Sequence, residues 1–398
     1  MEILWVCPFF LHPTDRGGQI RSLGTLRELH KRHRIHYAAL NDPTNLEGPS
    51  RSTEYATSFT AIDHTATARS SLAIIPQLLG SVSNPQPLAV SRYASAKLRE
   101  AIRSLLAERR FDVIVCDFLH AAPNIPDLHS AVLFQHNVET TIWRRHFERE
   151  QHPLKKRFIA MQVRKMEAYE REVCRQARHV IAVSDVDAAR MRQMFSIDRV
   201  EAVPTGVDVD YFARPPLPEP VTDLLFSGSM DWLPNVDAIE YFLSDIFPLI
   251  RARRPNTTFT IAGRSPDPRV HKAADGVAGV SITGSVPDMR PYLWGSQVSI
   301  VPLRIGGGTR LKVYEAMAAG SPVVSTTIGA EGLDYTDGEN ILIADTPEAF
   351  ASACLRLLDD RDARRRIATS ALALVQENFS WASVTRQFEA ILEANRAL

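Results

Sequence analysis

This chain of 398 residues has few cysteines and few glycines, and its formal net charge is zero. Its four cysteines lie far apart and form no Cys-x-x-Cys pair, which indicates a reduced, cytosolic protein and excludes a disulfide framework. Because 46 basic side chains balance 46 acidic ones, the total charge does not favour nucleic-acid binding. No apolar run reaches the roughly 18 residues of a membrane-spanning helix. The N-terminal segment 1–11 also lacks the basic start of a signal peptide.

Two common chemical motifs are missing as well. No His-x-x-x-His pair or cysteine cluster offers a metal site, so no metal is expected. No Gly-x-x-x-x-Gly-Lys-Ser/Thr loop is present, which argues against ATP hydrolysis. The length suits two or three domains of about 150 residues, each large enough for its own core.

Short apolar runs alternate with helix-like segments through both halves of the chain. This alternation is typical of βαβ units, in which helices cover the faces of a parallel sheet. The sequence therefore predicts an α/β protein with two similar domains. The expected strands are 3–7, 35–40, 113–116, 131–134 and 180–183, and then 224–226, 259–262, 280–282, 298–301, 323–325 and 341–343.

The domain boundary is predicted from proline. Segment 215–220 has four prolines in six positions, which neither a helix nor a central strand accommodates. We expect a first domain over 1–205, a hinge over 206–221 and a second domain over 222–380. The last segment, about 381–398, has helical periodicity and is expected to pack back on the first domain.

Glycine makes up only 19 of the 398 residues, so its clusters are informative. Gly17 and Gly18 follow the first predicted strand and precede a helix predicted over about 19–33. Two glycines let backbone N–H groups approach an anion at a helix N-terminus, where the helix dipole favours negative charge. A plain tight turn explains the pair equally well.

The second glycine cluster lies beside several cations. After a predicted strand, residues 306–308 are all glycine, and Thr309 can cap the helix that follows. Arg304, Arg310 and Lys312 bring up to three positive charges near that helix start. Consecutive N–H groups combined with cations are what a diphosphate site needs. The alternative is a strand-to-helix turn with solvated basic residues.

With this motif the chain resembles the retaining glycosyltransferases of family 4, also called group 1. Their GT-B architecture has two facing Rossmann-like domains. The most specific match is 315–324, Glu-Ala-Met-Ala-Ala-Gly-Ser-Pro-Val-Val, after the sequence Gly-Gly-Gly-Thr-Arg-Leu-Lys at 306–312. Other matches follow in the family's order: Gly17-Gly18, Gln135-His136-Asn137, and residues 203–208, 226–228, 261–263 and 282–288.

The resemblance implies a metal-independent, retaining transfer of a sugar from a nucleoside diphosphate to a glycan or lipid-linked acceptor. The nucleotide sugar is then a substrate, and no cofactor is implied. By the same resemblance His136, Arg310 and Lys312 are catalytic, and Gly17 and Gly18 form an acceptor or phosphate loop. The implied donor-binding residues, with Glu315 on the ribose, are Gly228, Ser229, Arg264, Val286, Arg304, Gly306, Gly307, Gly308, Thr309, Leu311 and Glu315.

Two positions depart from the family pattern. The family usually has a Glu eight positions before Glu315, where this chain has Gly307. The family also commonly places an Arg and a Lys after Gly228, whereas this chain continues Ser-Met-Asp-Trp-Leu-Pro-Asn. We expect Arg304, Arg310 or Lys312 to supply that charge, with Arg264 as a weaker candidate. The missing Glu leaves a second function open, a nucleotide-sugar-binding partner subunit of low activity, and a GT-B-fold sugar-nucleotide epimerase is a third.

Charge is distributed unevenly along the chain. Residues 1–200 carry a net charge of +7 and residues 201–398 carry −7, and segment 141–178 alone carries +6. Aromatic residues accompany these cations, so the segment is predicted to form an amphipathic basic helix that could rest on an anionic membrane surface. A solvated helical face is the alternative. We therefore expect a cytoplasmic protein, either free or bound at the inner face of the membrane, that takes part in surface polysaccharide or glycoconjugate synthesis.

Three acidic residues near predicted strand ends could bind an acceptor or simply cap loops. They are Asp15, Asp117 and Glu139.

Overall fold

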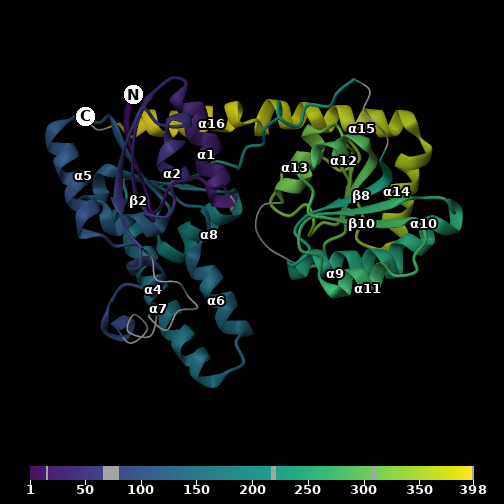
Figure 1. The fold of residues 1–398 in the computed structure, drawn as a ribbon, viewed down its shortest axis with the longest axis horizontal. Coiled ribbons are helices and arrows are strands. Elements are labelled where there is room, and N and C mark those ends of the chain that lie inside the picture. The colour runs from purple at the N-terminus through teal and green to yellow at the C-terminus, as the bar shows by residue number, and fades with distance from the viewer. Residues whose placement is uncertain (15–16, 66–79, 217–220, 306–309, 397–398) are drawn as a thin grey trace. The chain divides into compact units, whose positions relative to one another are not determined.

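The computed structural model describes the whole chain except residues 15–16, 66–79, 217–220, 306–309 and 397–398 and the side chain of Arg149. The described residues form two compact units, each built around its own parallel sheet (Figure 1). The first unit comprises Met1–Gly206 together with Val384–Leu398. The second comprises Val207–Ser383.

The sheet of the first unit has seven parallel strands in the order β3-β2-β1-β4-β5-β6-β7. Because the chain turns back between β1 and β4, the carboxyl ends of these two strands flank a topological switch point, where open α/β sheets bind ligands. The strands are β1 (Glu2–Cys7), β2 (Arg34–Asn41), β3 (Ser58–Asp63), β4 (Val113–Asp117), β5 (Ala131–Phe134), β6 (His179–Ala182) and β7 (Val200–Ala202).

Different helices cover the two faces of this sheet. Leu4 points to one face and packs in a core with Leu98 and Met166, which lie on two of the helices that cover this face. Its neighbour Trp5 points to the opposite face and stacks on Phe388, with ring centroids 5.8 Å apart. The helices are α1 (Gly17–His30), α2 (Glu47–Ser50), α4 (Leu88–Ser91), α5 (Ala96–Glu108), α6 (Glu139–Arg149), α7 (Pro153–Gln176), α8 (Asp185–Phe195) and α16 (Trp381–Ala394).

The second sheet has six parallel strands in the order β10-β9-β8-β11-β12-β13. The strands are β8 (Thr222–Ser227), β9 (Phe259–Ala262), β10 (Val280–Gly284), β11 (Ser296–Val301), β12 (Val323–Ser325) and β13 (Leu342–Ile343). The helices are α9 (Leu233–Tyr241), α10 (Phe247–Arg253), α11 (Pro268–Ala274), α12 (Arg290–Gly295), α13 (Leu311–Ala318), α14 (Pro347–Asp359) and α15 (Arg361–Leu374), with π-helical turns at Phe242–Ile246 and Val375–Phe379.

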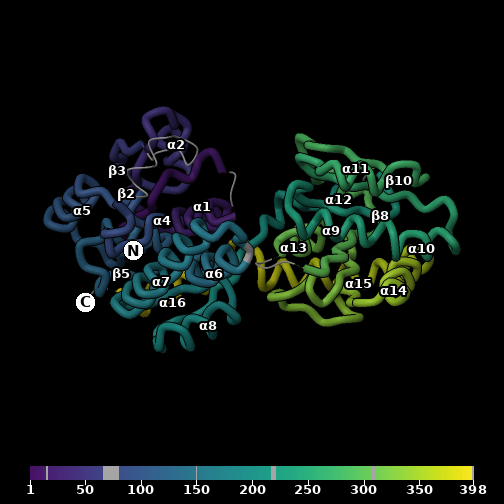
Figure 2. The backbone as a smooth tube through the Cα atoms, turned by 90° about the horizontal axis from the view of Figure 1, so that it is seen from below, coloured from purple at the N-terminus to yellow at the C-terminus, as the bar shows by residue number. Residues whose placement is uncertain are grey.

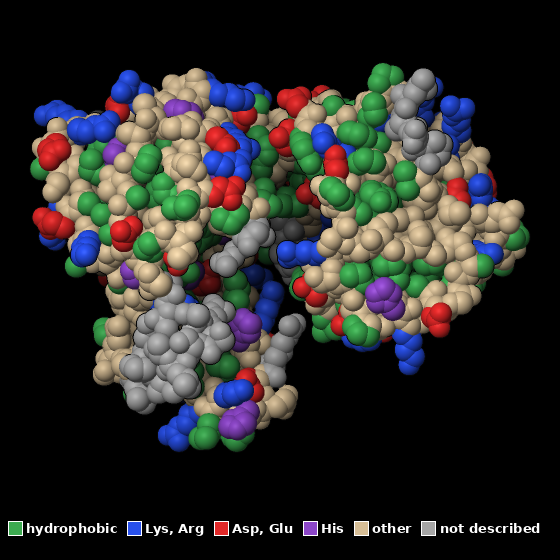
Figure 3. Space-filling model, in the orientation of Figure 1, with side chains coloured by type: hydrophobic (Ala, Val, Ile, Leu, Met, Phe, Trp, Pro, Cys, Tyr) green, Lys and Arg blue, Asp and Glu red, His purple; other side chains and the backbone are tan. Residues whose placement is uncertain are grey.

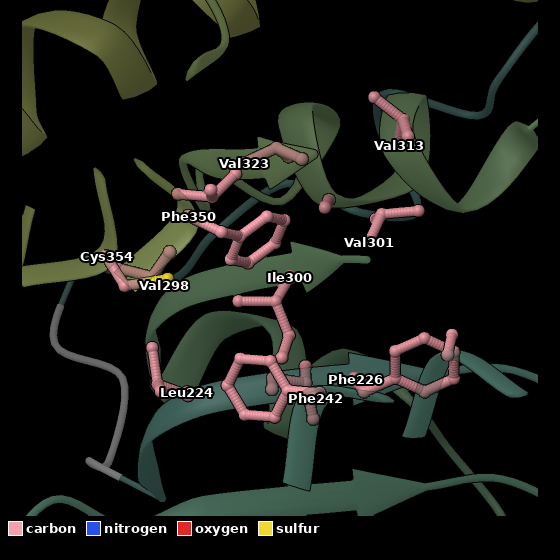
Figure 4. Packing of buried hydrophobic residues seen from close by; sticks show 14 of the residues in the cluster. Leu224, Phe226, Phe242, Val298, Ile300, Val301, Val313, Val323, Phe350 and Cys354 are labelled. Carbon is pink, nitrogen blue, oxygen red and sulfur yellow. The ribbon is translucent and has the colours of Figure 1, made fainter. Parts of the chain in front are cut away.

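Large aromatic side chains fill the core of the second unit. Phe242 follows α9 and packs against Phe259 of β9 at 4.7 Å between ring centroids, and Phe350 of α14 lies 6.2 Å away (Figure 4). Ile300 of β11 lies between these helices and the sheet. This packing holds the strands in register and so places their carboxyl ends side by side.

Part of the predicted hinge packs on the second unit. Val207 is buried and bridges to Ser380, while the main-chain oxygen of Phe212 accepts a hydrogen bond from the indole of Trp294 at 2.8 Å. The Arg290 guanidinium lies 4.1 Å from the ring centroid of Tyr211.

The basic segment 141–178 is not one helix, and that prediction is wrong. The chain breaks at 150–152, and α6 and α7 pack on each other as a hairpin (Figure 2). Pro153 is the physical reason, because proline at the first position of α7 has no N–H to continue the preceding helix. Among the described residues, no helix is both long and apolar enough to cross a membrane.

Candidate active site

In the second unit, several implied donor-binding residues gather at the carboxyl edge of the sheet. Gly228 follows β8, Arg264 lies shortly after β9, and Lys312 lies in the first turn of α13. Parallel strands end at the same edge, which brings these three positions together although they are up to 84 residues apart in the chain.

Lys312 is the central cation of this edge. Its Nζ donates a hydrogen bond to Asn235 Oδ1 at 2.9 Å and lies 4.3 Å from the ring centroid of Phe226. The pKa of Lys312 is lowered to about 7, chiefly by burial; the charge of Glu315 opposes this shift and that of Arg310 adds to it. Within the described residues, no carboxylate forms an ion pair with this ammonium. A desolvated cation of this kind gains most from an incoming anion.

Two glycines leave room for this arrangement. A Cβ on Gly228 would lie 2.8 Å from Lys312 Nζ, and a Cβ on Gly263 would lie 1.7 Å from the main-chain oxygen of Gly228. Only glycine therefore lets the ends of β8 and β9 approach each other and the lysine so closely.

Arg310 and Glu315 lie on either side of Lys312 in the sequence, Arg310 at the N-cap of α13 and Glu315 within the helix. Arg310 precedes α13 and is buried, with its guanidinium 5.9 Å from the ring centroid of Trp232. Glu315, one turn after Lys312, is half-buried; burial raises its pKa, and Lys312 opposes that shift. The structure thus brings together two cations and one carboxylate of the implied donor site.

The remaining implied donor residues differ in the side chains that they contact. Arg264 donates from Nε to Ser229 Oγ at 2.9 Å, so these two predicted residues are in contact. Arg304 instead forms a two-point ion pair with Asp237, with nitrogen–oxygen distances of 2.7 and 3.1 Å. The structure therefore does not support Arg304 as the source of free charge for a diphosphate, because Asp237 already neutralises it.

Other implied positions are less informative. Val286 lies in the loop after β10 and Leu311 begins α13, and both are half-buried. Gly306, Gly307, Gly308 and Thr309 lie outside the described residues.

In the first unit, His136 lies just beyond the carboxyl end of β5. Its Nε2 lies 2.7 Å from Oδ1 of Asp117, a fully buried carboxylate whose Oδ2 accepts a hydrogen bond from Trp5 at 2.9 Å. Burial lowers the pKa of His136, against the opposing effect of Asp117, so the ring is neutral near pH 7. A carboxylate can only accept, so Nε2 carries the proton and Nδ1 has a free lone pair.

Asp117 is therefore placed to orient His136, with both of its carboxyl oxygens already engaged by His136 and Trp5. Asp15 lies outside the described residues. Glu139 lies near the end of β5, as expected, and lines a cavity described below.

The sequence analysis missed Arg21, which is fully buried behind this site. Its guanidinium donates to the main-chain oxygens of Gln135, Ala182 and Val203, and thereby ties the ends of β5, β6 and β7 together. Burial lowers the pKa of Arg21 to about 9. No local pattern around Arg21 distinguishes it from an exposed helical arginine, because its partners lie more than 110 residues away.

Gly17 and Gly18 begin α1 beside His136, and the two glycines have different environments. A Cβ on Gly18 would lie 2.7 Å from the Phe118 ring, whereas a Cβ on Gly17 would meet nothing within 4 Å. The Phe118 ring in turn stacks on His136 with centroids 3.9 Å apart. Gly18 therefore provides the space in which Phe118 holds the histidine ring.

We predict opposite effects of alanine at these two glycines. Gly18→Ala should destabilise the protein by about 1–3 kcal/mol through overpacking against Phe118. Gly17→Ala, the matched control, should be neutral or slightly stabilising, because alanine is the better helix former. Urea unfolding of both variants measures the difference, and equal stabilities would contradict this role of Gly18.

Metal ligation has no candidate in the part of the chain that the structure describes. No group of three or more His, Cys, Asp or Glu side chains is close enough there to hold an ion.

The chain has two Rossmann-like units, each with a parallel sheet whose carboxyl edge is the usual place for a ligand. This architecture defines a protein of the GT-B fold class. Residues 16–211 match the family model for Glycosyltransferase Family 4, and residues 221–360 match that for Glycosyl transferases group 1. The chain belongs to this glycosyltransferase family.

Relatives of known name share part of the chain. The D-inositol 3-phosphate glycosyltransferase of a Nocardioides species is 28% identical over 247 residues, covering 55% of this chain and 54% of the relative. The phosphatidyl-myo-inositol mannosyltransferase of Mycobacterium leprae is 27% identical over 222 residues, covering 54% and 58%. The chain thus spans about half the length of the curated relatives it matches.

Solved structures match the fold over the full chain. Sucrose-phosphate synthase from Thermosynechococcus elongatus superposes with a TM-score of 0.68 at 18% identity, covering 99% of this chain and 98% of the other. Anabaena HepE, solved in complex with UDP and glucose, gives a TM-score of 0.64 at 14% identity and covers 99% and 100%. These likenesses confirm the predicted GT-B architecture.

Proposed function

We propose that this protein is a retaining glycosyltransferase that moves a sugar from a nucleoside diphosphate to a hydroxyl of a glycan or lipid-linked acceptor. The observation that carries the proposal is Lys312, a desolvated ammonium at a helix start beside Gly228, with Arg310 next to it. Such a site fits a diphosphate. Two findings on relatives support the donor class, because HepE was solved with UDP and glucose and the named curated relatives are glycosyltransferases.

In this mechanism the bond between the sugar and the β-phosphate oxygen breaks, and negative charge develops on the leaving diphosphate. Lys312 and Arg310 stabilise that charge in a water-poor environment. The acceptor hydroxyl attacks from the face that the diphosphate leaves, and its proton passes to a phosphate oxygen. No protein nucleophile and no metal are needed for these steps.

Two further side chains have roles in this proposal. His136 keeps the catalytic role that the resemblance implies, because its unprotonated Nδ1 has no hydrogen-bond partner among the described residues and can accept from a sugar hydroxyl. Glu315 can accept both ribose hydroxyls with its two oxygens.

The sequence at Gly307 favours one competing function, a nucleotide-sugar-binding subunit with little activity. Incubating the purified protein with UDP-, GDP-, ADP- and dTDP-sugars without added metal separates the possibilities. Release of one nucleoside diphosphate supports transfer. Thermal stabilisation by a nucleotide without release, even with lipid acceptors present, supports the binding subunit, and a changed nucleotide sugar supports an epimerase.

Glu315→Gln tests the ribose contact. We expect nucleotide affinity to fall by about tenfold or more, because hydrogen bonds to a charged acceptor are worth about 1.5–3 kcal/mol. Folding stability should not fall, since burial already disfavours the charged form of this carboxyl. Calorimetric titration and thermal unfolding measure the two effects, and a large drop in melting temperature would assign Glu315 a structural role instead.

We further propose that the protein works in the cytoplasm, at an anionic membrane surface. The support is the free end of the α6–α7 hairpin, where exposed Leu154 precedes Lys155, Lys156 and Arg157. Figure 3 shows basic and apolar side chains mixed at this end of the hairpin, lowest in the view. Flotation with liposomes that is independent of anionic lipid would remove this part of the proposal.

A further inference from the structure

The first unit contains a cavity of about 690 Å³ that begins beside His136. Gly18 and Phe118, which contact the histidine, form one end of its lining, and Asn137 and Glu139 lie there too. This volume is within the range of about 300–1,000 Å³ that small-molecule sites occupy.

One face of α6 forms a continuous side of the cavity. Glu139, Ile142, Trp143 and His146 all line it, and their spacing of three, four and seven residues places them on the same side of the helix. The face is polar in the first turn and apolar in the second. Phe158 and Ile159 of α7 add to the apolar part of the lining.

A second hollow, of about 470 Å³ and largely open to solvent, lies on the same helix. It shares Trp143, His146 and Ile159 with the first cavity and reaches Glu150 and Gln151 at the turn between α6 and α7. The lining residues of the two cavities together extend from Glu139 at the start of α6 to the turn after it, and the 11 residues of α6 span about 16 Å at 1.5 Å per residue.

The carboxyl at the polar end has an unusual neighbour. Glu170 of α7 lies behind Glu139 and is itself saturated, because it accepts hydrogen bonds from Gln135, from the Glu139 main chain, and from the main chain and hydroxyl of Thr140 at 2.6–3.0 Å. Burial, and the charge of Glu170, raise the pKa of Glu139 to about 7. Near neutral pH the Glu139 carboxyl can therefore both donate to and accept from a hydroxyl group.

We propose that the larger cavity binds the aliphatic chain of an amphiphilic acceptor. Its hydroxyl-bearing head lies at Asn137 and Glu139 beside His136, and its chain runs along Ile142 and Trp143 toward the hairpin turn. The apolar stretch of Ile142, Trp143, Phe158 and Ile159 next to the polar pair Asn137 and Glu139 carries this inference, since a free sugar would leave the apolar part unfilled. The interpretation of this cavity as an acceptor site rests on the proposed transferase function. The binding of an aliphatic chain in the cavity does not depend on that function.

A fluorescence experiment on the full chain tests the proposal. Dodecyl glucoside with bromine on its terminal carbons, used below its micelle concentration, should quench tryptophan fluorescence, because bromine quenches an indole that it contacts. Glucose alone should have no effect. Trp143→Phe, which keeps an apolar ring in the wall, should lose most of the quenching. Undiminished quenching in this variant would overturn the assignment of the chain to this cavity.

Two matched aspartate variants measure the affinity. Ile142→Asp puts a charge into the apolar wall and should weaken binding of the dodecyl glucoside at least tenfold. Val186→Asp replaces an exposed valine of α8 outside the cavities and should leave the affinity unchanged. Equal affinities of the two variants, with melting temperatures showing both folded, would refute the proposal.

Failure of amphiphile binding can be distinguished from failure of the transferase function. If the chain binds as expected but no nucleoside diphosphate is released from any sugar donor, the amphiphile site stands and transfer fails. If release occurs and the chain does not bind, transfer stands and this inference is wrong.

Discussion

Lys312→Ala should lower kcat/KM for the nucleotide sugar by about 10- to 150-fold. The estimate corresponds to the loss of about 1.5–3 kcal/mol for one charge-assisted contact to the leaving diphosphate. Lys272→Ala is the matched control, because that lysine is exposed on α11 of the same unit. Steady-state release of nucleoside diphosphate measures both variants. Unchanged kinetics in Lys312→Ala would remove the lysine from the site.

The pH dependence of donor binding gives an independent test of the same lysine. Burial holds the pKa of Lys312 at about 7 in the donor-free protein, and a bound diphosphate should raise it. Affinity should therefore be nearly constant below pH 7 and fall by up to tenfold per pH unit above it, because the ammonium must be protonated to bind. Lys312→Arg should abolish this slope, since arginine stays charged. A pH-independent affinity in the wild type would contradict the argument.

The lowered pKa of Lys312 also makes folding stability depend on pH, in the direction opposite to that for a salt-bridged lysine. The unfolded chain, with a lysine pKa near 10.4, binds the proton more tightly than the folded chain does. Folding stability of the donor-free protein should therefore rise between about pH 7 and pH 10. Lys312→Met should be more stable than the wild type below pH 7, with the difference shrinking at higher pH.

Asp117→Asn should reduce turnover by about 100-fold or more while the protein stays folded. Asparagine would donate to His136 Nε2, so the ring proton would move to Nδ1 and the lone pair offered to the sugar would be lost. Turnover in a donor-hydrolysis assay and thermal unfolding measure the two effects. Activity equal to wild type would show that the protonation state of His136 does not matter.

Trp5→Phe separates the stabilising role of Asp117 from its orienting role. It removes the indole hydrogen bond to Oδ2 but leaves the contact between Oδ1 and His136. Stability should fall, since a buried carboxylate loses a donor, while turnover per folded molecule should change much less than in Asp117→Asn.

Central strands were predictable because they are buried on both faces and read as unbroken apolar runs. The two strands that the sequence analysis missed, β3 and β7, are the edges of the first sheet. β3 alternates half-buried and exposed residues and β7 has only three residues. An edge strand pairs on one side only, so its sequence needs less apolar character.

The site residues were predicted where glycines and cations share a local motif. Gly228, Lys312 and Glu315 lie as the resemblance implies at the carboxyl edge of the second sheet. Asn235 and Asp237 were not predicted, although they decide which cation is available. Both lie on α9, about 70 residues before the motif, and nothing in their local sequence marks them.

By itself the amino-acid sequence determined the order of strands and helices, the two-domain α/β architecture and the family, because periodicity and motifs are local properties of the chain. Only the tertiary structure decided which charges are already neutralised. Arg304 and Lys312 look equivalent in the sequence, yet Asp237 neutralises the first, whereas the second donates to a neutral amide, lies against a ring and has no ion pair among the residues that the structure describes. Desolvation and ion pairing depend on neighbours brought together by folding, and those neighbours give each ionisable group its final protonation state.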